Sequence, residues 1–151
     1  MHAGVHMKVT FANSCKAVQT EMLGRVTGGT AAKPWTDPHN GGHYSCINTC
    51  KIGSARFMLK RKTGGQGRYT DKIDLSFKPS GTKCEVTACS ESQVTSYKDF
   101  STNFCNIRNL YCGPGDKCPT VGPVLTFSER VTKTLAGSTT DKNACIAGGG
   151  H

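Results

Sequence analysis

The number of cysteines constrains this chain more than any other feature of its sequence. Nine cysteines occur in 151 residues. Each disulfide removes conformational freedom from the unfolded chain and stabilises the fold by about 2–4 kcal/mol. Hydrophobic residues make up only 36% of the sequence, so we expect disulfides to support a modest core. Heavy cysteine use is typical of an oxidising compartment, and we therefore expect a secreted, extracellular protein. The length of the chain predicts one domain, residues 1–151, and the patterns described below predict that it is a β-domain.

The cysteine spacing favours disulfides over metal or redox chemistry. No Cys-x-x-Cys occurs, although this spacing defines zinc knuckles and thioredoxin-like dithiols. The run HNGGHYSCINTC, residues 39–50, could in principle hold zinc, but a glycine-rich loop explains it without a metal. We expect no metal site and no cofactor. The candidates for structural disulfides are Cys15, Cys46, Cys50, Cys84, Cys89, Cys105, Cys112, Cys118 and Cys145.

The pairing of these cysteines is only partly constrained by the sequence. Nine is an odd number, so one thiol stays free or joins two chains. A bond between Cys15 and Cys145 would connect the first and last strands. It would give the largest gain in stability, because it closes the longest loop of the unfolded chain. The short spacing of Cys84 and Cys89 also allows a local bond between them. The remaining connectivity stays open.

Hydrophobic alternation predicts a mainly β fold. Val5, Met7, Val9 and Phe11 alternate with more polar neighbours, which is the period of a half-buried strand. Residues 30–45 contain prolines and glycines and are expected to form a loop, whereas residues 99–112 predict one short helix capped by Asp99 or Ser101. The fold class expected is all-β, or mainly β with one short helix, as a disulfide-stapled antiparallel β-sandwich or barrel. Further strands are predicted over residues 17–27, 55–62, 68–78, 82–89 and 122–135.

The charge balance favours anionic partners. Lys and Arg number 19 against 10 Asp and Glu, a net charge of +9, although solubility alone would also explain a basic chain. The densest cluster is KRKTGGQGR, residues 60–68, around a glycine-rich turn. It could contact phosphates or an anionic polysaccharide, although a solvated hairpin end is the simpler explanation. The contact-surface candidates are Lys60, Arg61, Lys62, Arg68 and Arg108.

No residue pattern in the sequence requires catalysis. His43 with Glu85 or Glu91 and Arg108 could supply the base, acid and cation of a ribonuclease, but nothing in their spacing demands it. Asp71 and Asp74 are three apart on a predicted strand and hence on opposite faces, which makes them a poor glycosidase pair. We therefore predict no catalytic residues. No apolar run approaches the length of a transmembrane segment.

Two stretches of the sequence resemble known families. CSESQVTSYKDFSTNFCNIRNLYC, residues 89–112, resembles small secreted cysteine-rich proteins of filamentous fungi, including elicitors of the plant hypersensitive response. KVTFANSC, residues 8–15, together with Cys145 looks like the start and clasp of thaumatin-like β-sandwiches. The elicitor resemblance implies a virulence effector in the host apoplast that triggers plant defence through a plant cell-surface receptor or an apoplastic protein. The alternative is a secreted basic hydrolase or antimicrobial toxin that acts on RNA, cell-wall polymer or membrane.

Overall fold

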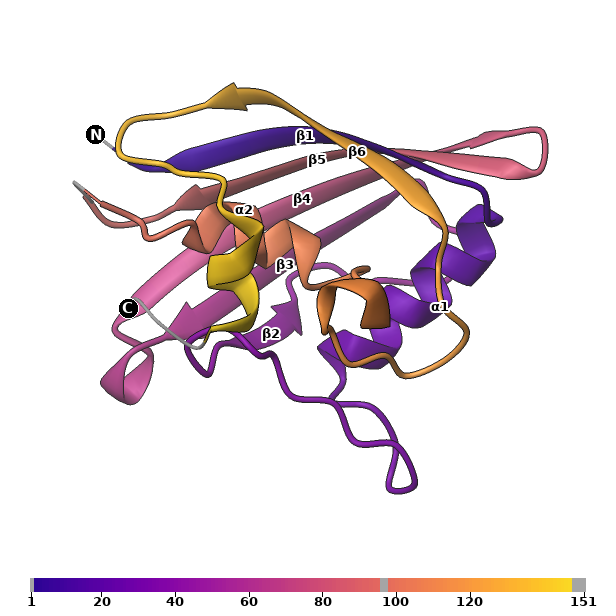
Figure 1. Ribbon diagram of the computed structural model, residues 1–151, viewed down its shortest axis with the longest axis horizontal. Coiled ribbons are helices and arrows are strands. Elements are labelled where there is room, and N and C mark those ends of the chain that lie inside the picture. The colour runs from indigo at the N-terminus through magenta and orange to yellow at the C-terminus, as the bar shows by residue number, and fades with distance from the viewer. Residues whose placement is uncertain (1, 96–97, 148–151) are drawn as a thin grey trace.

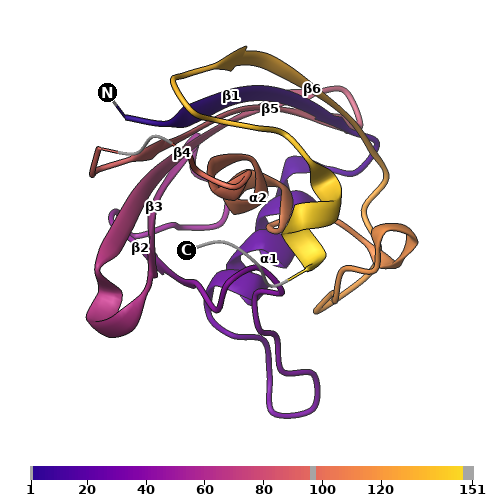
Figure 2. The same cartoon turned by 60° about the vertical axis from the view of Figure 1, so that its left-hand side comes forward.

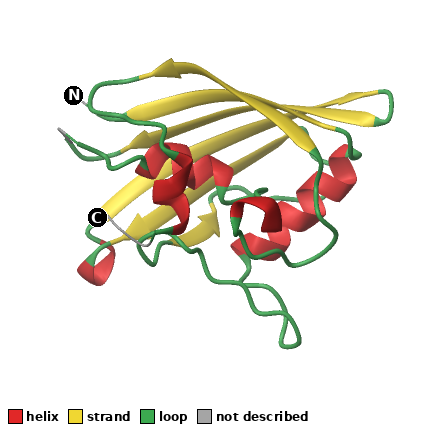
Figure 3. Ribbon diagram, in the orientation of Figure 1, coloured by secondary structure: helices red, strands yellow, loops and turns green. Residues whose placement is uncertain are grey.

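The protein is mainly β and forms one six-stranded antiparallel sheet (Figures 1 and 3). The computed structural model describes residues 2–95 and 98–147. The strands follow the order β2-β3-β4-β5-β1-β6. The predicted fold class, mainly β, antiparallel and stapled by disulfides, is confirmed, but the described strands form one open sheet and neither a two-sheet sandwich nor a closed barrel. The strands are β1 (Gly4–Phe11), β2 (His43–Cys46), β3 (Arg56–Thr63), β4 (Tyr69–Ser80), β5 (Lys83–Ser92) and β6 (Phe127–Thr134).

The sheet is a single curved layer with the helices on its inner side (Figures 1 and 2). Side chains from the inner face of the sheet and from the helices fill the space between them, and alternate residues of each strand point outward. The two α-helices are α1 (Cys15–Val26) and α2 (Thr102–Arg108), and three short 3₁₀ turns are η1 (Gly65–Gly67), η2 (Pro114–Asp116) and η3 (Lys142–Ile146). In the described part of the chain, no helix is long and apolar enough to cross a membrane.

The predicted strand over residues 17–27 is wrong, because this segment forms α1. The Ser14 hydroxyl accepts a hydrogen bond from the Ala17 amide at 3.1 Å and so caps the helix. Val18, Met22 and Arg25 are buried and recur at spacings of four and three, which places them on one helical face. The segment is also rich in strong helix formers. Helical periodicity was therefore present in the sequence beside the apparent alternation.

The other predicted elements are found in the structure with shifted ends. The alternation of β1 is confirmed, since Val5, Met7, Val9 and Phe11 are all buried. Residues 55–62, 68–78 and 82–89 form the meander β3-β4-β5, and residues 122–135 form β6 from Phe127 onward. The predicted helix is the short α2. Residues 30–45 are a loop as predicted until the edge strand β2 begins at His43.

Four disulfides join the sheet, the helices and the loops. The proposed Cys15–Cys145 clasp is wrong, since these two cysteines pair with different partners. A Cys84–Cys89 bond is also ruled out: the two residues are five apart on β5, so their side chains point to opposite faces, and Cys89 is free. The observed pairs are Cys15–Cys84, Cys46–Cys50, Cys105–Cys145 and Cys112–Cys118.

Candidate interaction surface

The outer face of strands β2, β3 and β4 carries a group of basic side chains. Cross-strand register places His43 opposite Lys62 and Lys60 opposite Lys72. We call these four residues the outer basic patch. His43, Lys62 and Lys72 are exposed and Lys60 is half-buried. None of the four forms an ion pair with any residue in 2–95 or 98–147, so no carboxylate neutralises the three lysines through an ion pair.

Arg68 lies beside this patch at the end of the β3-β4 hairpin. It is exposed and directly follows η1. The turn packs closely against the strand, because a Cβ added at Gly67 would approach the Lys62 Cδ to 3.2 Å. Of the five predicted contact residues, Lys60 and Lys62 thus lie on the outer face of the sheet, and Arg68 is exposed in the turn next to Lys62.

Arg61 is placed differently from its two neighbours, and its prediction as a contact residue is wrong. Its side chain is only 1% exposed and points to the inner side of the sheet. Nε donates to Asp37 Oδ2 at 2.9 Å, while Nη2 donates to the His39 carbonyl and to Asn40 Oδ1. The guanidinium also lies over the Tyr44 ring, 5.5 Å from its centroid. Arg61 therefore holds the loop before β2 against the sheet.

Arg108 is also buried, and its prediction as a contact residue is wrong for the same reason. It is 2% exposed on α2. Its Nε donates to both Glu129 carboxylate oxygens, at 3.0 and 3.1 Å, and its Nη2 bonds Glu129 and Asp116 at 2.8 Å each. The Tyr111 hydroxyl donates to the same Glu129 carboxylate at 2.8 Å. This cluster attaches α2 to β6 and leaves no free cation for a partner.

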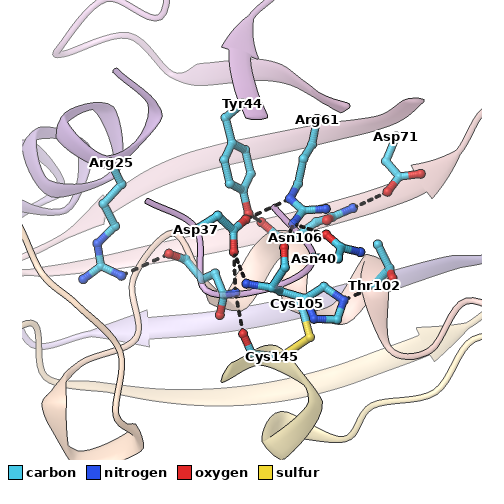
Figure 4. Close-up of polar contacts among 12 residues, drawn as sticks. Arg25, Asp37, Asn40, Tyr44, Arg61, Asp71, Thr102, Cys105, Asn106 and Cys145 are labelled. Atoms are coloured by element: carbon cyan, nitrogen blue, oxygen red, sulfur yellow. Dashed lines mark hydrogen bonds and ion pairs between the residues drawn. A yellow bond between two sulfur atoms is a disulfide. The ribbon is translucent and has the colours of Figure 1, made fainter. Parts of the chain in front are cut away.

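A buried polar network occupies the inner side of the sheet around Asp37 (Figure 4). The Asp37 carboxylate accepts from Arg61, from the His39 amide at 2.9 Å and from the Asn109 side chain at 2.9 Å. Burial lowers the pKa of His39, and the nearby Arg61 charge lowers it further. A neutral imidazole fits its contacts, since Nδ1–H donates to the Ala144 carbonyl at 2.8 Å and Nε2 accepts from the Thr102 hydroxyl at 3.2 Å.

Asparagines of α2 connect this network to the sheet, and sequence analysis did not find them. The Asn106 amide donates to Asp71 Oδ2 at 2.7 Å and to Ser90 Oγ at 3.1 Å. Two buried atoms lack a hydrogen-bond partner among the described residues, Asn106 Oδ1 and Arg61 Nη1. The signal available in the sequence was the recurrence of Asn103, Asn106 and Asn109 at three-residue spacing, which gathers polar groups on one side of a helix.

The structure does not assemble the ribonuclease-like arrangement considered from the sequence. His43 is on β2 and Glu91 is on β5, so β3 and β4 separate them by roughly 14 Å at the usual strand spacing. Arg108 is buried on the opposite side of the sheet from His43. Asp71 faces inward and Asp74 faces outward, as the strand period predicted.

Three of the four candidate zinc ligands in residues 39–50 have other bonding partners. Cys46 and Cys50 are bonded to each other, and both ring nitrogens of His39 are engaged in hydrogen bonds. Within residues 2–95 and 98–147, no group of three or more potential metal ligands comes together.

Cys89 is the unpaired cysteine and lies on the outer face of β5. Its Sγ is 3.5 Å from Nε2 of His6 on the neighbouring strand. Burial raises the pKa of the Cys89 thiol, and the carboxylates of Glu91 and Asp74 raise it further. The thiol is therefore protonated at neutral pH and is not an activated nucleophile.

Comparison of the chain with models of known protein families, with curated proteins and with solved structures found no match in any of the three.

Proposed function

We propose that this protein is a secreted fungal effector of the elicitor kind, which a plant recognises through the shape and charge of its folded surface. The resemblance of residues 89–112 to such elicitors supports the proposal. The observation that carries it is the outer basic patch, three lysines and one histidine on neighbouring strands that form no ion pair within residues 2–95 and 98–147.

Repulsion between the like charges of the patch destabilises the fold, and a bound anionic partner would reduce this repulsion. Like charges directly opposite each other on a sheet are destabilising, and the patch contains the pair Lys60 and Lys72. Lys72 also lies opposite Glu91 on β5, which offsets part of this repulsion without forming an ion pair. The lysines remain available to an anionic surface of a plant receptor or apoplastic protein. Cys46–Cys50 bonds the end of β2 to the loop that follows it, and Cys15–Cys84 bonds α1 to β5. These bonds hold the sheet that carries the patch in one geometry, which lowers the ordering cost of binding.

The first experiment is infiltration of leaves with the folded protein beside a reduced and alkylated sample, scoring cell death and oxidative burst. We expect the folded protein to act and the reduced protein to be inactive, because recognition depends on the conformation. If neither form produces a response, the elicitor proposal is wrong, and ribonuclease and wall-polymer assays would then test the alternative of a hydrolase or toxin.

A charge-reversal variant tests whether the patch is the recognised surface. We expect Lys60→Glu, Lys62→Glu and Lys72→Glu together to raise the dose needed for cell death roughly tenfold or more, since reversed charges repel an anionic partner. The matched control is Lys16→Glu, Lys51→Glu and Lys33→Glu, which makes the same charge change at exposed positions outside the sheet. Equal loss in both triple variants would show that net charge, and not the patch, determines the response.

A further inference from the structure

A second feature of the outer face is a groove over strands β5, β1 and β6, with a volume of about 440 Å³. This volume lies in the range of small-molecule binding sites. The pairing of β1 with β6 shifts register between His6 and Met7, and such a bulge increases the local twist of a sheet. Figure 1 shows β6 turning across β1 at this side of the molecule. The register shift thus lies next to the groove, whose lining begins at Lys8 on β1.

The groove is lined by two rows of exposed side chains that run across the three strands. The first row is Thr87 on β5, Lys8 on β1 and Arg130 on β6. The second row is Glu85, Thr10 and Ser128 on the same strands. All six side chains are exposed and line the groove. These six side chains offer two cations, one carboxylate and three hydroxyl groups, whereas Glu129, which also lines the groove, is bonded to Arg108.

The two cations of the groove are directly opposite each other, and neither is neutralised. Lys8 pairs with Arg130 across β1 and β6, and like charges in this position oppose pairing. Neither residue forms an ion pair within the described ranges 2–95 and 98–147, and neither does Glu85. An anionic group placed between Lys8 and Arg130 would remove the repulsion and accept charge-assisted hydrogen bonds from both.

The rest of the lining indicates which kind of anion fits. Non-specific binding of single-stranded nucleic acid relies on aromatic side chains that stack on bases, and among residues 2–95 and 98–147 no aromatic residue lines this groove. The Glu85 carboxylate can accept hydrogen bonds from the hydroxyl groups of a sugar, which a DNA phosphate backbone does not offer. The hydroxyls of Thr10, Thr87 and Ser128 can both donate and accept. This mixture is complementary to a ligand that carries one carboxylate and several hydroxyls on each unit.

We infer that this groove binds an acidic sugar unit of a uronate polysaccharide, with its carboxylate between Lys8 and Arg130 and its hydroxyls on the second row. The groove lies apart from the outer basic patch, since β3 and β4 belong to the patch and β1 and β6 to the groove. It would bind this ligand whether or not a plant responds to the protein.

The test is a calorimetric titration of the folded protein with an oligogalacturonate, beside the same oligosaccharide with its carboxylates methyl-esterified. We expect binding of the acid form that weakens as salt is added, because exposed charges are screened. The ester should not bind measurably. Equal binding of acid and ester would overturn the role of the cations, and no binding of the acid would overturn the proposal.

Two single variants locate the site. Lys8→Gln and Arg130→Gln should each weaken oligogalacturonate binding roughly tenfold, which corresponds to the loss of one charge-assisted hydrogen bond. The control Lys60→Gln removes a cation from the outer basic patch and should leave the affinity within about twofold, since it is outside the groove. An equal effect of all three variants would overturn the assignment to the groove.

Folding is a separate readout for the same variants. Lys8→Gln and Arg130→Gln remove a like-charge contact, so their melting temperatures should equal or exceed that of the parent protein. Weaker binding in a protein that is at least as stable is the result expected from a ligand site. Inorganic phosphate and single-stranded DNA serve as competitors, and displacement of the oligogalacturonate by either at lower concentration than by the free uronate would overturn the sugar assignment.

Discussion

Asp71 is a buried carboxyl whose charge is only partly compensated. Burial raises its pKa, while hydrogen bonds from Asn106 and Ser92 and the charge of Arg61 act in the opposite direction. The folded pKa is therefore higher than the unfolded value of about 3.9. The contribution of Asp71 to stability is fully present at a pH below the pKa that Asp71 has in the unfolded chain. It is lost as the pH rises through the higher pKa that Asp71 has in the folded protein, because Asp71 ionises at lower pH in the unfolded chain than in the folded one.

Replacement of this carboxyl by an amide should thus stabilise the protein at neutral pH. We expect the advantage of Asp71→Asn over the parent to be near zero below roughly pH 4 and to grow as the pH rises. The new amide can also donate to Asn106 Oδ1, which lacks a partner among the described residues. Urea unfolding across a pH series measures the effect. A difference that does not change with pH would contradict it.

The matched control for this substitution is Asp74→Asn, which removes the same charge from the outer face of the same strand. Asp74 is partly exposed and forms an ion pair with Arg56. Its replacement should give no gain that grows with pH.

The three consecutive cations of β3 show how far single residues could be predicted. Lys60 and Lys62 face outward as expected of charged side chains. Arg61 shares the inner face with Phe57 and Leu59, and strict alternation from these two residues would have placed it there. The sequence could not reveal that Asp37 is the partner of Arg61. The two residues are 24 positions apart, and a loop of irregular backbone brings the Asp37 carboxylate to the guanidinium.

At the scale of elements, the start of α2 depends on one carboxylate. Phe100 and Ser101 adopt left-handed backbone conformations, with φ of 53° and 63°. Ser101 occupies the cap position without a side-chain cap bond. The Asp99 carboxylate instead accepts hydrogen bonds from the amides of Ser101 at 3.0 Å, Asn103 at 3.1 Å and Thr139 at 3.2 Å. Of the two predicted caps, Asp99 provides the interaction, and it also holds the segment before η3.

Removal of this carboxylate should therefore destabilise the whole fold. We expect Asp99→Ala to lower the free energy of unfolding by about 2 kcal/mol or more, because several buried amides lose their acceptor. The control is Asp141→Ala, which removes the cap of η3 at an exposed position and should cost about 1 kcal/mol or less. Chemical denaturation compares the two, and equal losses would show that Asp99 acts only as an ordinary cap.

Elements were predictable where one periodicity dominated. The strands of the meander β3-β4-β5 alternate clearly and are separated by glycine-containing turns, so both hairpins were expected. Residues 17–27 combine β-branched residues with good helix formers, and the burial of Gln19, Glu21 and Arg25 hid the helical face from a count of apolar residues. β2 is only four residues long, and the sequence between β2 and β3 contains no short turn that would predict their pairing.

At the scale of the whole molecule, the disulfides differ greatly in the length of chain they close. Cys15–Cys84 joins the start of α1 to β5 with a sequence separation of 69, whereas Cys46–Cys50 spans a separation of 4. In the chain-entropy account, the stabilisation by a disulfide grows with the logarithm of the loop it closes. The pairing itself could not be read from spacing, because it depends on which strands become neighbours.

Removal of each bond should reveal this difference. We expect the double variant Cys15→Ala and Cys84→Ala to lose about 4 kcal/mol, and the double variant Cys46→Ala and Cys50→Ala to lose about 2 kcal/mol. Denaturant unfolding of the oxidised proteins gives both values. Comparable losses, or the reverse order, would mean that native contacts of the bonds outweigh their effect on the unfolded chain.

The unpaired Cys89 provides a single site at which a thiol-reactive label can be attached. All nine cysteines are in the described part of the chain, and eight of them are locked in disulfides. Cys89 belongs to β5, the strand between the outer basic patch and the row of Lys8 and Arg130. Because burial raises the pKa of its thiol, a maleimide dye would attach best at mildly alkaline pH. A fluorophore attached to Cys89 would report the binding of a ligand either at the outer basic patch or at the groove over β5, β1 and β6.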